Sequence, residues 1–399
     1  MSGPRDVDIL AADESLSEAF VTEVLASLVR TDSRNEPGVH EAVMAARVAE
    51  WLEPTRATVT LVESLPDRPS VAAVLEGSND GPRLVLNGHM DTHPIDDPNA
   101  WTTDPLGAEI RDGYLYGRGS CDMKGGLTAQ IAVAYYLSQH IDLLKGSLIL
   151  HFAIGEERGE PGTLSLVEAG FVGDYGVVTE PTELRVAAAE RGTAWYTIRI
   201  KGRSIHASRA HLGVNPLYRL GAALDVIKSY DREIGSRPHP LLPGGSCTPG
   251  IVAGGVKENS VPDYCDVTVD RRLLPGETVD GEMEAIRALL EPLKDDDPDF
   301  DFEISRYRAA FEAAEISMNS AFAARALDAV EAVTGARTAL WGTPYSSDIG
   351  DLVHRGGIES ITFGPGDVAE CHCADERVEL AQVRDGARVL ARLACDVLL

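Results

Sequence analysis

The chain is poor in cysteine, in aromatic residues and in positive charge. Its 399 residues include 6 cysteines, and aromatic residues make up 6% of the sequence. Six cysteines in a chain of this length do not form a disulfide framework, so we expect free thiols in a reducing cytoplasm. The 36 basic residues are outnumbered by 63 acidic ones, which gives a formal net charge of -27. Such an acidic balance argues against nucleic acid and anionic membranes as partners.

Long apolar runs and targeting signals are also missing. No uninterrupted apolar stretch reaches the length of a membrane span. The N-terminal sequence MSGPRDVDILAADES has no apolar core of the kind that a signal peptide requires. We find no internal repeat and no low-complexity segment. The length predicts two or three domains, and 44% hydrophobic with 25% charged residues is ordinary for a soluble, cytoplasmic protein.

Two kinds of pattern divide the chain. Residues 1–186 alternate helical spacing, as at 15–30 and 39–53, with continuous apolar runs, which indicates an α/β arrangement around a buried sheet. Residues 187–308 alternate cleanly and follow the order β-α-β-β-α-β of a split ferredoxin-like unit. The α/β pattern then resumes over residues 309–399. We therefore predict an α/β domain in two segments with a smaller ferredoxin-like domain inserted between them.

Histidine and acidic side chains follow the buried runs of the first segment. The run RLVLNG ends at His89, with Asp91 two residues further on, and SLILHFAIG leads directly into Glu156 and Glu157. Two acids directly after a buried strand are poorly explained by a solvated loop. Side chains at the carboxyl ends of strands in an open α/β sheet gather at one site. This pattern favours a functional site at that edge.

Three more residues of the same kind extend the set. Asp122 follows the glycine-rich YGRGSC and precedes a predicted helix, for which it could also be the N-cap. Glu180 follows the short run DYGVVT, and pairing with Arg185 or Arg191 is its alternative role. His372 lies near the end of the chain. A set of nitrogen and oxygen ligands suits two divalent metals, and it leaves one carboxylate free to act as a base.

Five motifs occur in order along nearly the whole chain: GHMDT, GRGSCDMKGG, GEE, TEPT and GPGDVAECHCADE. Together they resemble the M20 clan of co-catalytic zinc peptidases and deacylases. The resemblance implies a di-metal aminopeptidase-like catalytic domain made of residues 1–186 and 309–399. It also implies that the inserted domain, residues 187–308, is a lid through which two copies form a homodimer.

The resemblance assigns metal ligands. His89 and Glu180 would bind one divalent ion, Glu157 and His372 would bind the other, and Asp122 would bridge the two. Zinc is the metal that the resemblance favours, and cobalt and manganese are the alternatives.

Further roles follow from the same resemblance. Glu156 would be the general base that takes a proton from a water held between the metals. Asp91 would hydrogen-bond the imidazole of His89 and fix its tautomer. A cis peptide bond would follow Asp122, before Met123.

Substrate contacts are implied in both domains. His206 resembles the lid histidine that holds the oxyanion, in some members from the partner subunit, and an exposed loop histidine is the alternative. Asn259 and Arg272 resemble a clamp for a substrate carboxylate, and Arg271 should point to the opposite face of its strand. Gly364 would let the backbone approach the substrate, with a plain turn as the alternative.

The implied reaction is hydrolysis of a linear amide in a small-molecule substrate with a free carboxylate. An N-acyl amino acid, acetylornithine-like or succinyl-diaminopimelate-like, is the first expectation. A carboxypeptidase or dipeptidase and an aminohydrolase acting on an aromatic amine are the rivals. An N-carbamoyl amidohydrolase is disfavoured, because that branch has histidine at the position of Glu180. A metal-free binding module is disfavoured by the complete ligand set.

Two features depart from the family pattern. His93 stands where the family has a small apolar residue, so it could line the substrate pocket or offer a further ligand. Cys371 and Cys373 flank His372. In an extended segment both thiols would point away from the histidine.

Overall fold

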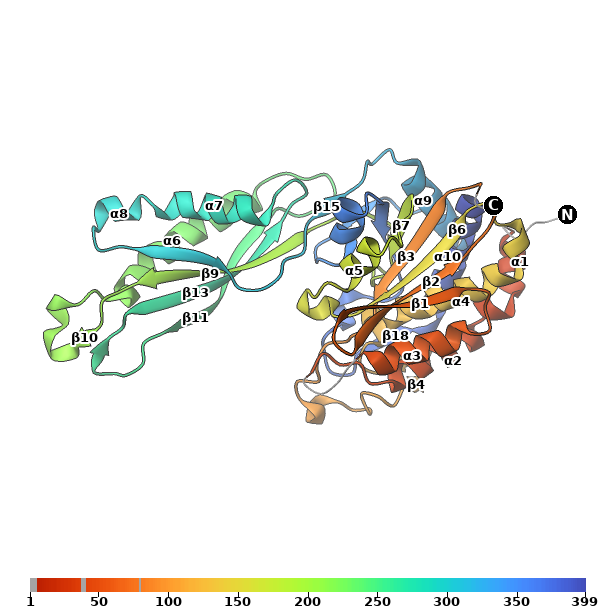
Figure 1. Cartoon of the computed structure of the whole chain (residues 1–399), viewed down its shortest axis with the longest axis horizontal. Coiled ribbons are helices and arrows are strands. Elements are labelled where there is room, and N and C mark those ends of the chain that lie inside the picture. The colour runs from red at the N-terminus through yellow and green to blue at the C-terminus, as the bar shows by residue number, and fades with distance from the viewer. Residues whose placement is uncertain (1–5, 37–40, 79) are drawn as a thin grey trace. The chain divides into compact units, whose positions relative to one another are not determined.

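The computed structural model describes residues 6–36, 41–78 and 80–399. The first five residues of the chain and residues 39 and 40 of the predicted helix 39–53 lie outside this description. The chain forms two compact units, labelled by their elements in Figure 1. The first unit comprises Met1–Ala189, Glu315–Thr343 and Ser347–Leu399, and the second comprises Glu190–Ala314 and Pro344–Ser346.

The second unit begins and ends a few residues later than the inserted domain predicted at 187–308. It also takes in Pro344–Ser346, which the sequence pattern did not indicate. Within the described residues, no helix has both the length and the apolar character needed to cross a membrane.

The first unit is built on a mixed sheet, with nine strands among the described residues, in the order β1-β2-β6-β3-β7-β17-β8-β15, with β16 pairing with β8. The strands are β1 (Thr58–Leu65), β2 (Arg68–Leu75), β3 (Arg83–His89), β6 (Ser147–Ala153), β7 (Tyr175–Val178), β8 (Ala187–Glu190), β15 (Ala314–Glu315), β16 (Trp341–Thr343) and β17 (Glu359–Thr362). Strands β6 and β7 run parallel to β3, and His89 is level with Ala153. The carboxyl ends of these three strands therefore meet at one edge of the sheet.

Helices cover this sheet and supply most of the hydrophobic core. They are α1 (Val7–Ala12), α2 (Glu18–Arg30), α3 (Ala42–Leu52), α4 (Gly125–Gln139), α5 (Gly162–Glu168), α9 (Ala321–Thr334) and α10 (Leu380–Leu398). Helix α2 begins after Ser17, whose hydroxyl accepts the backbone N–H of Phe20 at 3.2 Å and so caps the helix. Helix α4 is almost entirely buried, and its apolar residues are spread around the helix rather than confined to one face.

The first unit also contains a three-stranded sheet, in the order β18-β5-β4. Its strands are β4 (Glu109–Arg111), β5 (Tyr114–Tyr116) and β18 (Arg377–Glu379). Strand β18 is antiparallel to β5, with Arg377 opposite Tyr116. This pairing joins the end of the chain to the loop that carries Asp122.

The second unit has the predicted order β-α-β-β-α-β. Its antiparallel sheet, in the order β11-β13-β9-β14, consists of β9 (Gly192–Lys201), β11 (Ser246–Gly254), β13 (Tyr264–Leu273) and β14 (Phe302–Arg306). The helices are α6 (Pro216–Gly235), α7 (Val279–Leu290) and α8 (Leu293–Asp296), and the short pair β10 (Ile205–His206) and β12 (Ser260–Val261) extends the unit. Alternation along β9 puts Tyr196, Ile198 and Ile200 into a core with residues of α6 and α7.

Candidate metal centre

Several side chains that the sequence predicted as metal ligands lie where the buried strands of the first unit end. His89 is the last residue of β3, and Glu156 and Glu157 follow β6 in a short helical turn. Glu180 follows β7, and its position is supported by helix α4. Two residues of α4 contact Thr179, which precedes Glu180. A side chain at Gly126 would collide with the carbonyl oxygen of Thr179, and Gln130 donates to the Thr179 hydroxyl at 2.8 Å.

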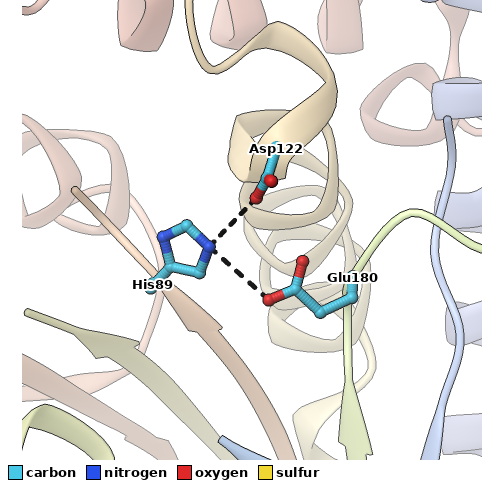
Figure 2. A group of neighbouring side chains, drawn as sticks. All are labelled: His89, Asp122 and Glu180. Carbon is cyan, nitrogen blue, oxygen red and sulfur yellow. Dashed lines mark hydrogen bonds and ion pairs between the residues drawn. The ribbon is translucent and has the colours of Figure 1, made fainter. Parts of the chain in front are cut away.

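Five side chains that the sequence predicted as ligands come together in two groups that share Asp122. In the first group, Nε2 of His89 lies 3.1 Å from Oδ1 of Asp122 and 3.5 Å from Oε1 of Glu180, as Figure 2 shows. In the second group, Nε2 of His372 lies 3.1 Å from Oδ2 of Asp122 and 3.2 Å from Oε1 of Glu157. Each oxygen of Asp122 thus faces a different imidazole.

These spacings fit divalent cations. Two ligand atoms that each lie ~2.1 Å from a tetrahedral zinc ion are about 3.4 Å apart. The nitrogen–oxygen distances of 3.1–3.5 Å in both groups are close to this value. Nitrogen and oxygen donors without a thiolate suit zinc, cobalt or manganese.

The electrostatics of the groups also favour cations. Burial alone would lower the pKa of His89, but the carboxylates of Glu180 and Asp122 raise it well above its usual value. Burial likewise opposes a high pKa for His372, yet Asp122 and Glu157 raise that pKa to about 10. The carboxyl of Asp122 has a pKa well below its usual range, because both imidazoles outweigh the effect of burial. Positive charge is therefore strongly stabilised between these side chains.

Glu156 lies beside the two groups but belongs to neither of them. Its nearest oxygen is 4.0 Å from Nε2 of His89, and its side chain is 12% exposed. Burial raises the pKa of Glu156 well above its usual value; His89 opposes this, and Asp348 adds to it. A carboxyl group with a raised pKa is suited to accepting and returning a proton.

The hydrogen bond expected from the Asp91 carboxylate is made by its main chain instead. Nδ1 of His89 donates to the Asp91 carbonyl oxygen at 2.8 Å, whereas the nearest Asp91 carboxylate oxygen is 3.6 Å away. The carboxylate accepts the backbone N–H groups of Glu156 at 3.1 Å and Glu157 at 3.2 Å. Asp91 therefore fixes the imidazole tautomer through its backbone, and its side chain shapes the turn that carries both glutamates.

Two alternatives raised by the sequence are not what the structure contains. Helix α4 begins at Gly125, and no side-chain hydrogen bond caps its N-terminus, so Asp122 is not its N-cap. The two arginines considered as partners of Glu180 have other contacts. Arg185 packs over the ring of Trp341, and Arg191 donates to the carbonyl oxygens of Pro344 and Gly244. The peptide bond between Asp122 and Met123 is cis, as the resemblance implied.

Sequence reasoning missed a buried carboxylate next to Asp122. Glu376 is fully buried, and its Oε1 accepts the backbone N–H groups of Cys121 at 3.0 Å and Asp122 at 3.1 Å. Its Oε2 accepts from Arg118 at 2.7 Å. The only sequence signal was its place in the motif GPGDVAECHCADE, four residues after His372.

The residues that depart from the family pattern, His93, Cys371 and Cys373, lie near His372 of the second group. The ring of His93 stacks on that of His372, with centroids 4.3 Å apart and an interplanar angle of 23°. The segment around His372 is not extended as expected, because His372 has a φ of 59°. Cys371 contacts Cys121 with sulfur atoms 3.7 Å apart, and Cys373 donates to the carbonyl oxygen of Glu370.

Gly364 lies against the chain's own backbone, and its expected approach to a substrate stays a prediction. A side chain there would lie 2.5 Å from the carbonyl oxygen of Thr179 and 2.6 Å from that of Glu180. Its N–H donates to the Thr182 hydroxyl, and its carbonyl oxygen accepts the N–H groups of Thr182 and Leu184. The close approach is therefore to the chain's own backbone that carries Glu180, and its polar groups already have partners within the protein.

The second unit contains the other predicted residues. His206 is exposed and opposite Ser260, and the N–H of Ala207 donates to the carbonyl oxygen of Asn259 at 2.9 Å, so His206 and Asn259 are neighbours.

Arg272 lies on β13, where it pairs with Asp270 through Nε at 2.8 Å and Nη2 at 3.1 Å and donates from Nη1 to Thr193. Arg271 is fully buried and bound to Glu277 and Glu282, on the opposite face as expected.

A family model agrees with this arrangement. The model described as "Peptidase family M20/M25/M40" matches residues 85–396, which include every residue of both ligand groups. The chain belongs to this family.

Curated relatives of this M20 protein include deacylating enzymes. It is 25% identical to N-formyl-4-amino-5-aminomethyl-2-methylpyrimidine deformylase of Halalkalibacterium halodurans, over 94% of each chain. It is 29% identical to acetylornithine deacetylase of Myxococcus xanthus, over 82% of this chain and 83% of that protein.

Solved structures share the fold of this M20 chain. A tripeptidase from Staphylococcus aureus superposes with a TM-score of 0.78 at 18% identity, over 96% of this chain and 98% of the other. A dinuclear metal-binding M20 peptidase from Bacillus subtilis superposes with a TM-score of 0.73 at 17% identity, over 97% and 99% of the two chains.

Proposed function

We propose that this M20 hydrolase removes a short acyl group from the nitrogen of a small N-acyl amino acid, with acetylornithine-like and succinyl-diaminopimelate-like compounds first. One observation carries the proposal. Asp122 is shared between two three-residue ligand groups, and the unshared carboxylate of Glu156 lies next to them. Such a pair of sites with a spare base is suited to amide hydrolysis.

Two divalent ions at these ligands, zinc first and cobalt or manganese as alternatives, would polarise a water molecule and the scissile carbonyl group. Glu156 takes the proton of the attacking water, since a carboxylate with a raised pKa binds a proton more strongly. It then returns this proton to the departing amine nitrogen. Asp91 holds Glu156 and Glu157 in one turn, so the base and a ligand keep a fixed spacing.

Substrate recognition is proposed for residues of the second unit. Arg272 and Asn259 would hold a free carboxylate, which the planar guanidinium suits, and His206 would bind the carbonyl oxygen as it becomes an oxyanion. Arg272 pairs with Thr193, at the start of β9, and His206 lies beyond Lys201, at the other end. The stretch from Thr193 to Lys201 is about 26 Å long at ~3.3 Å per residue.

This separation supports a homodimer. A small substrate cannot reach both Arg272 and His206 of the same chain, so we propose that His206 and Asn259 serve the site of a second copy. Strand β11 is an edge strand with exposed Ile251 and Val252, which suits pairing with another chain. Sedimentation velocity at micromolar concentration tests this, and a fully active monomer would exclude it.

The lack of disulfides among the described residues supports a location in the reducing cytoplasm, where disulfides are rare. No disulfide joins any of the cysteines, not even Cys121 and Cys371, whose sulfur atoms are in contact. Fractionation of cells that express the protein tests this location.

A second candidate substrate lacks the carboxylate. Asp270 already occupies two nitrogen atoms of Arg272, which weakens its attraction for a further anion. The deformylase relative is named for a formylated aminopyrimidine, a compound without a carboxyl group. An N-acyl amine on an aromatic ring is therefore the alternative.

A hydrolysis panel separates these substrates. It comprises N-acetyl, N-succinyl and N-formyl amino acids, a formylated aminopyrimidine and simple dipeptides, each assayed with added zinc or cobalt. Each N-acyl amino acid is matched with its α-amide, which differs only in the carboxylate. The proposal expects faster cleavage of the acid than of the amide. Equal rates would favour the aromatic amine, and preference for dipeptides would make the enzyme a peptidase.

A further inference from the structure

We propose that Glu376, together with Arg118, is the residue pair that positions the bridging ligand Asp122. This inference rests on the proposed metal-dependent function. The Glu376 side chain makes no hydrogen bond to a predicted ligand side chain but accepts two consecutive backbone N–H groups, those of Cys121 at 3.0 Å and Asp122 at 3.1 Å. These two bonds fix the backbone from which the Asp122 carboxylate extends between the two imidazoles.

The main chain of Glu376 holds the same loop from its other end. The N–H of Gly117 donates to the Glu376 carbonyl oxygen at 2.8 Å, directly after the pairing of β5 with β18. Gly119 between them has a φ of 81°, a backbone conformation that favours glycine. One residue thus holds both ends of the loop from Gly117 to Asp122.

Arg118 offsets part of the cost of burying a carboxylate at this depth, although burial still raises the pKa of Glu376 to about 7. Both side chains are nearly inaccessible to solvent, at 2% for Arg118 and 1% for Glu376, and they form an ion pair at 2.7 Å. The guanidinium also lies over the ring of Trp101, at 5.3 Å from its centroid. Without Arg118, a buried carboxylate next to Asp122 would be strongly disfavoured.

The position of Glu376 also links the two ligand groups. It lies four residues after His372, in the segment that supplies a ligand to the second group, while its bonds orient Asp122, which belongs to both. A shift of Asp122 would therefore disturb both groups at once. Residues that orient metal ligands in this way typically change metal affinity by about 10- to 100-fold when they are replaced.

The test uses the full chain, stripped of metal and titrated with cobalt(II) while its absorption spectrum is recorded. Replacing Glu376 alone leaves Arg118 buried without a partner and risks unfolding, so both residues are changed. The variant Glu376→Ala/Arg118→Met lacks the accepting oxygen, whereas Glu376→Gln/Arg118→Met keeps one. We expect the first to bind cobalt roughly 10- to 100-fold more weakly, with an altered spectrum, and the second to recover most of the affinity.

The second unit offers a matched control in Glu282, a buried carboxylate that pairs with the buried Arg271 at 3.0 Å. Glu282→Gln should lower thermal stability and leave cobalt binding unchanged. Unchanged affinity in Glu376→Ala/Arg118→Met, failure of the glutamine variant to recover affinity, or equal weakening in Glu282→Gln would overturn the inference. If the wild-type protein itself binds no cobalt, the proposed function fails first and the positioning role falls with it.

Discussion

Neighbouring glutamates with opposite expected phenotypes give the sharpest test of the centre. Glu157 faces His372 at 3.2 Å, within the spacing of a shared cation, whereas Glu156 is no closer than 4.0 Å to His89. Glutamine has nearly the shape of glutamate but cannot act as a base. We therefore compare Glu156→Gln with Glu157→Gln under identical conditions.

Glu156→Gln should keep the metal and lose turnover. Removal of a general base typically costs 10²- to 10⁴-fold in rate. This loss corresponds to about 3–5 kcal/mol at 1.36 kcal/mol per decade. Because burial disfavours the ionised form of Glu156, its neutral replacement should not lower the melting temperature of the metal-free protein. Glu157→Gln should instead lose metal from the second group along with activity.

Metal content by elemental analysis, kcat on the best substrate of the panel and thermal melts of the metal-free proteins provide the three readouts. Turnover of Glu156→Gln within tenfold of wild type would refute its role as the base. Equal loss of metal in both variants would show that Glu156 is a ligand and that its exclusion from the two ligand groups is wrong.

Three further changes test other parts of the argument. Arg272→Ala should lower kcat/KM for N-acyl amino acids roughly 10- to 200-fold, the range for loss of a charged hydrogen bond of about 1.5–3 kcal/mol, and leave metal content unchanged; an equal effect on the matched α-amides would contradict carboxylate binding. His93→Ala should weaken metal binding roughly 2- to 10-fold by removing a stack of about 0.5–1.5 kcal/mol, and His93→Phe should restore it; identical titrations of the two variants would refute the stacking role. Burial lowers the pKa of His151 to about 4, so on acidification the unfolded chain binds a proton at this histidine before the folded chain does. The free energy of unfolding should therefore fall by about 3 kcal/mol between pH 6.5 and pH 4. Urea unfolding across this range should show a flatter profile for His151→Gln, and an unchanged profile would disprove the assignment.

The sequence predicted the parts of the fold that depend on local pattern. Continuous apolar runs marked β3 and β6, and because both are parallel and buried, the residues that follow them had to meet at one edge. Alternation in β13 placed Arg271 and Arg272 on opposite faces, and the structure finds one fully buried and the other partly exposed. Helix ends fell within a few residues of their predicted positions, since caps such as Ser17 act locally.

Contacts between distant segments could not be predicted in the same way. The hairpin of β1 and β2 and the small sheet of β4, β5 and β18 depend on pairings that no local pattern announces. The carbonyl oxygen of Asp91, rather than its carboxylate, bonds to His89, because the carboxylate is needed by the glutamate turn. The residue types therefore predicted that His89 and Asp91 are hydrogen-bonded, but not which atom of Asp91 accepts the bond.

Glu376 shows why the supporting residues of such a centre are harder to find than its ligands. The predicted ligands His89, Glu157 and Glu180 are marked by their chemistry and by their place at or after the end of a buried strand, and both are visible in the sequence. Glu376 is separated from Asp122 by most of the chain, and its Oε1 bonds there are to backbone N–H groups, which every residue except proline possesses. The antiparallel pairing of β18 with β5 brings it there. The same segment carries His372, whose Nε2 lies 3.1 Å from Asp122, so the C-terminal part of the chain brings both a predicted ligand and its proposed support to one place.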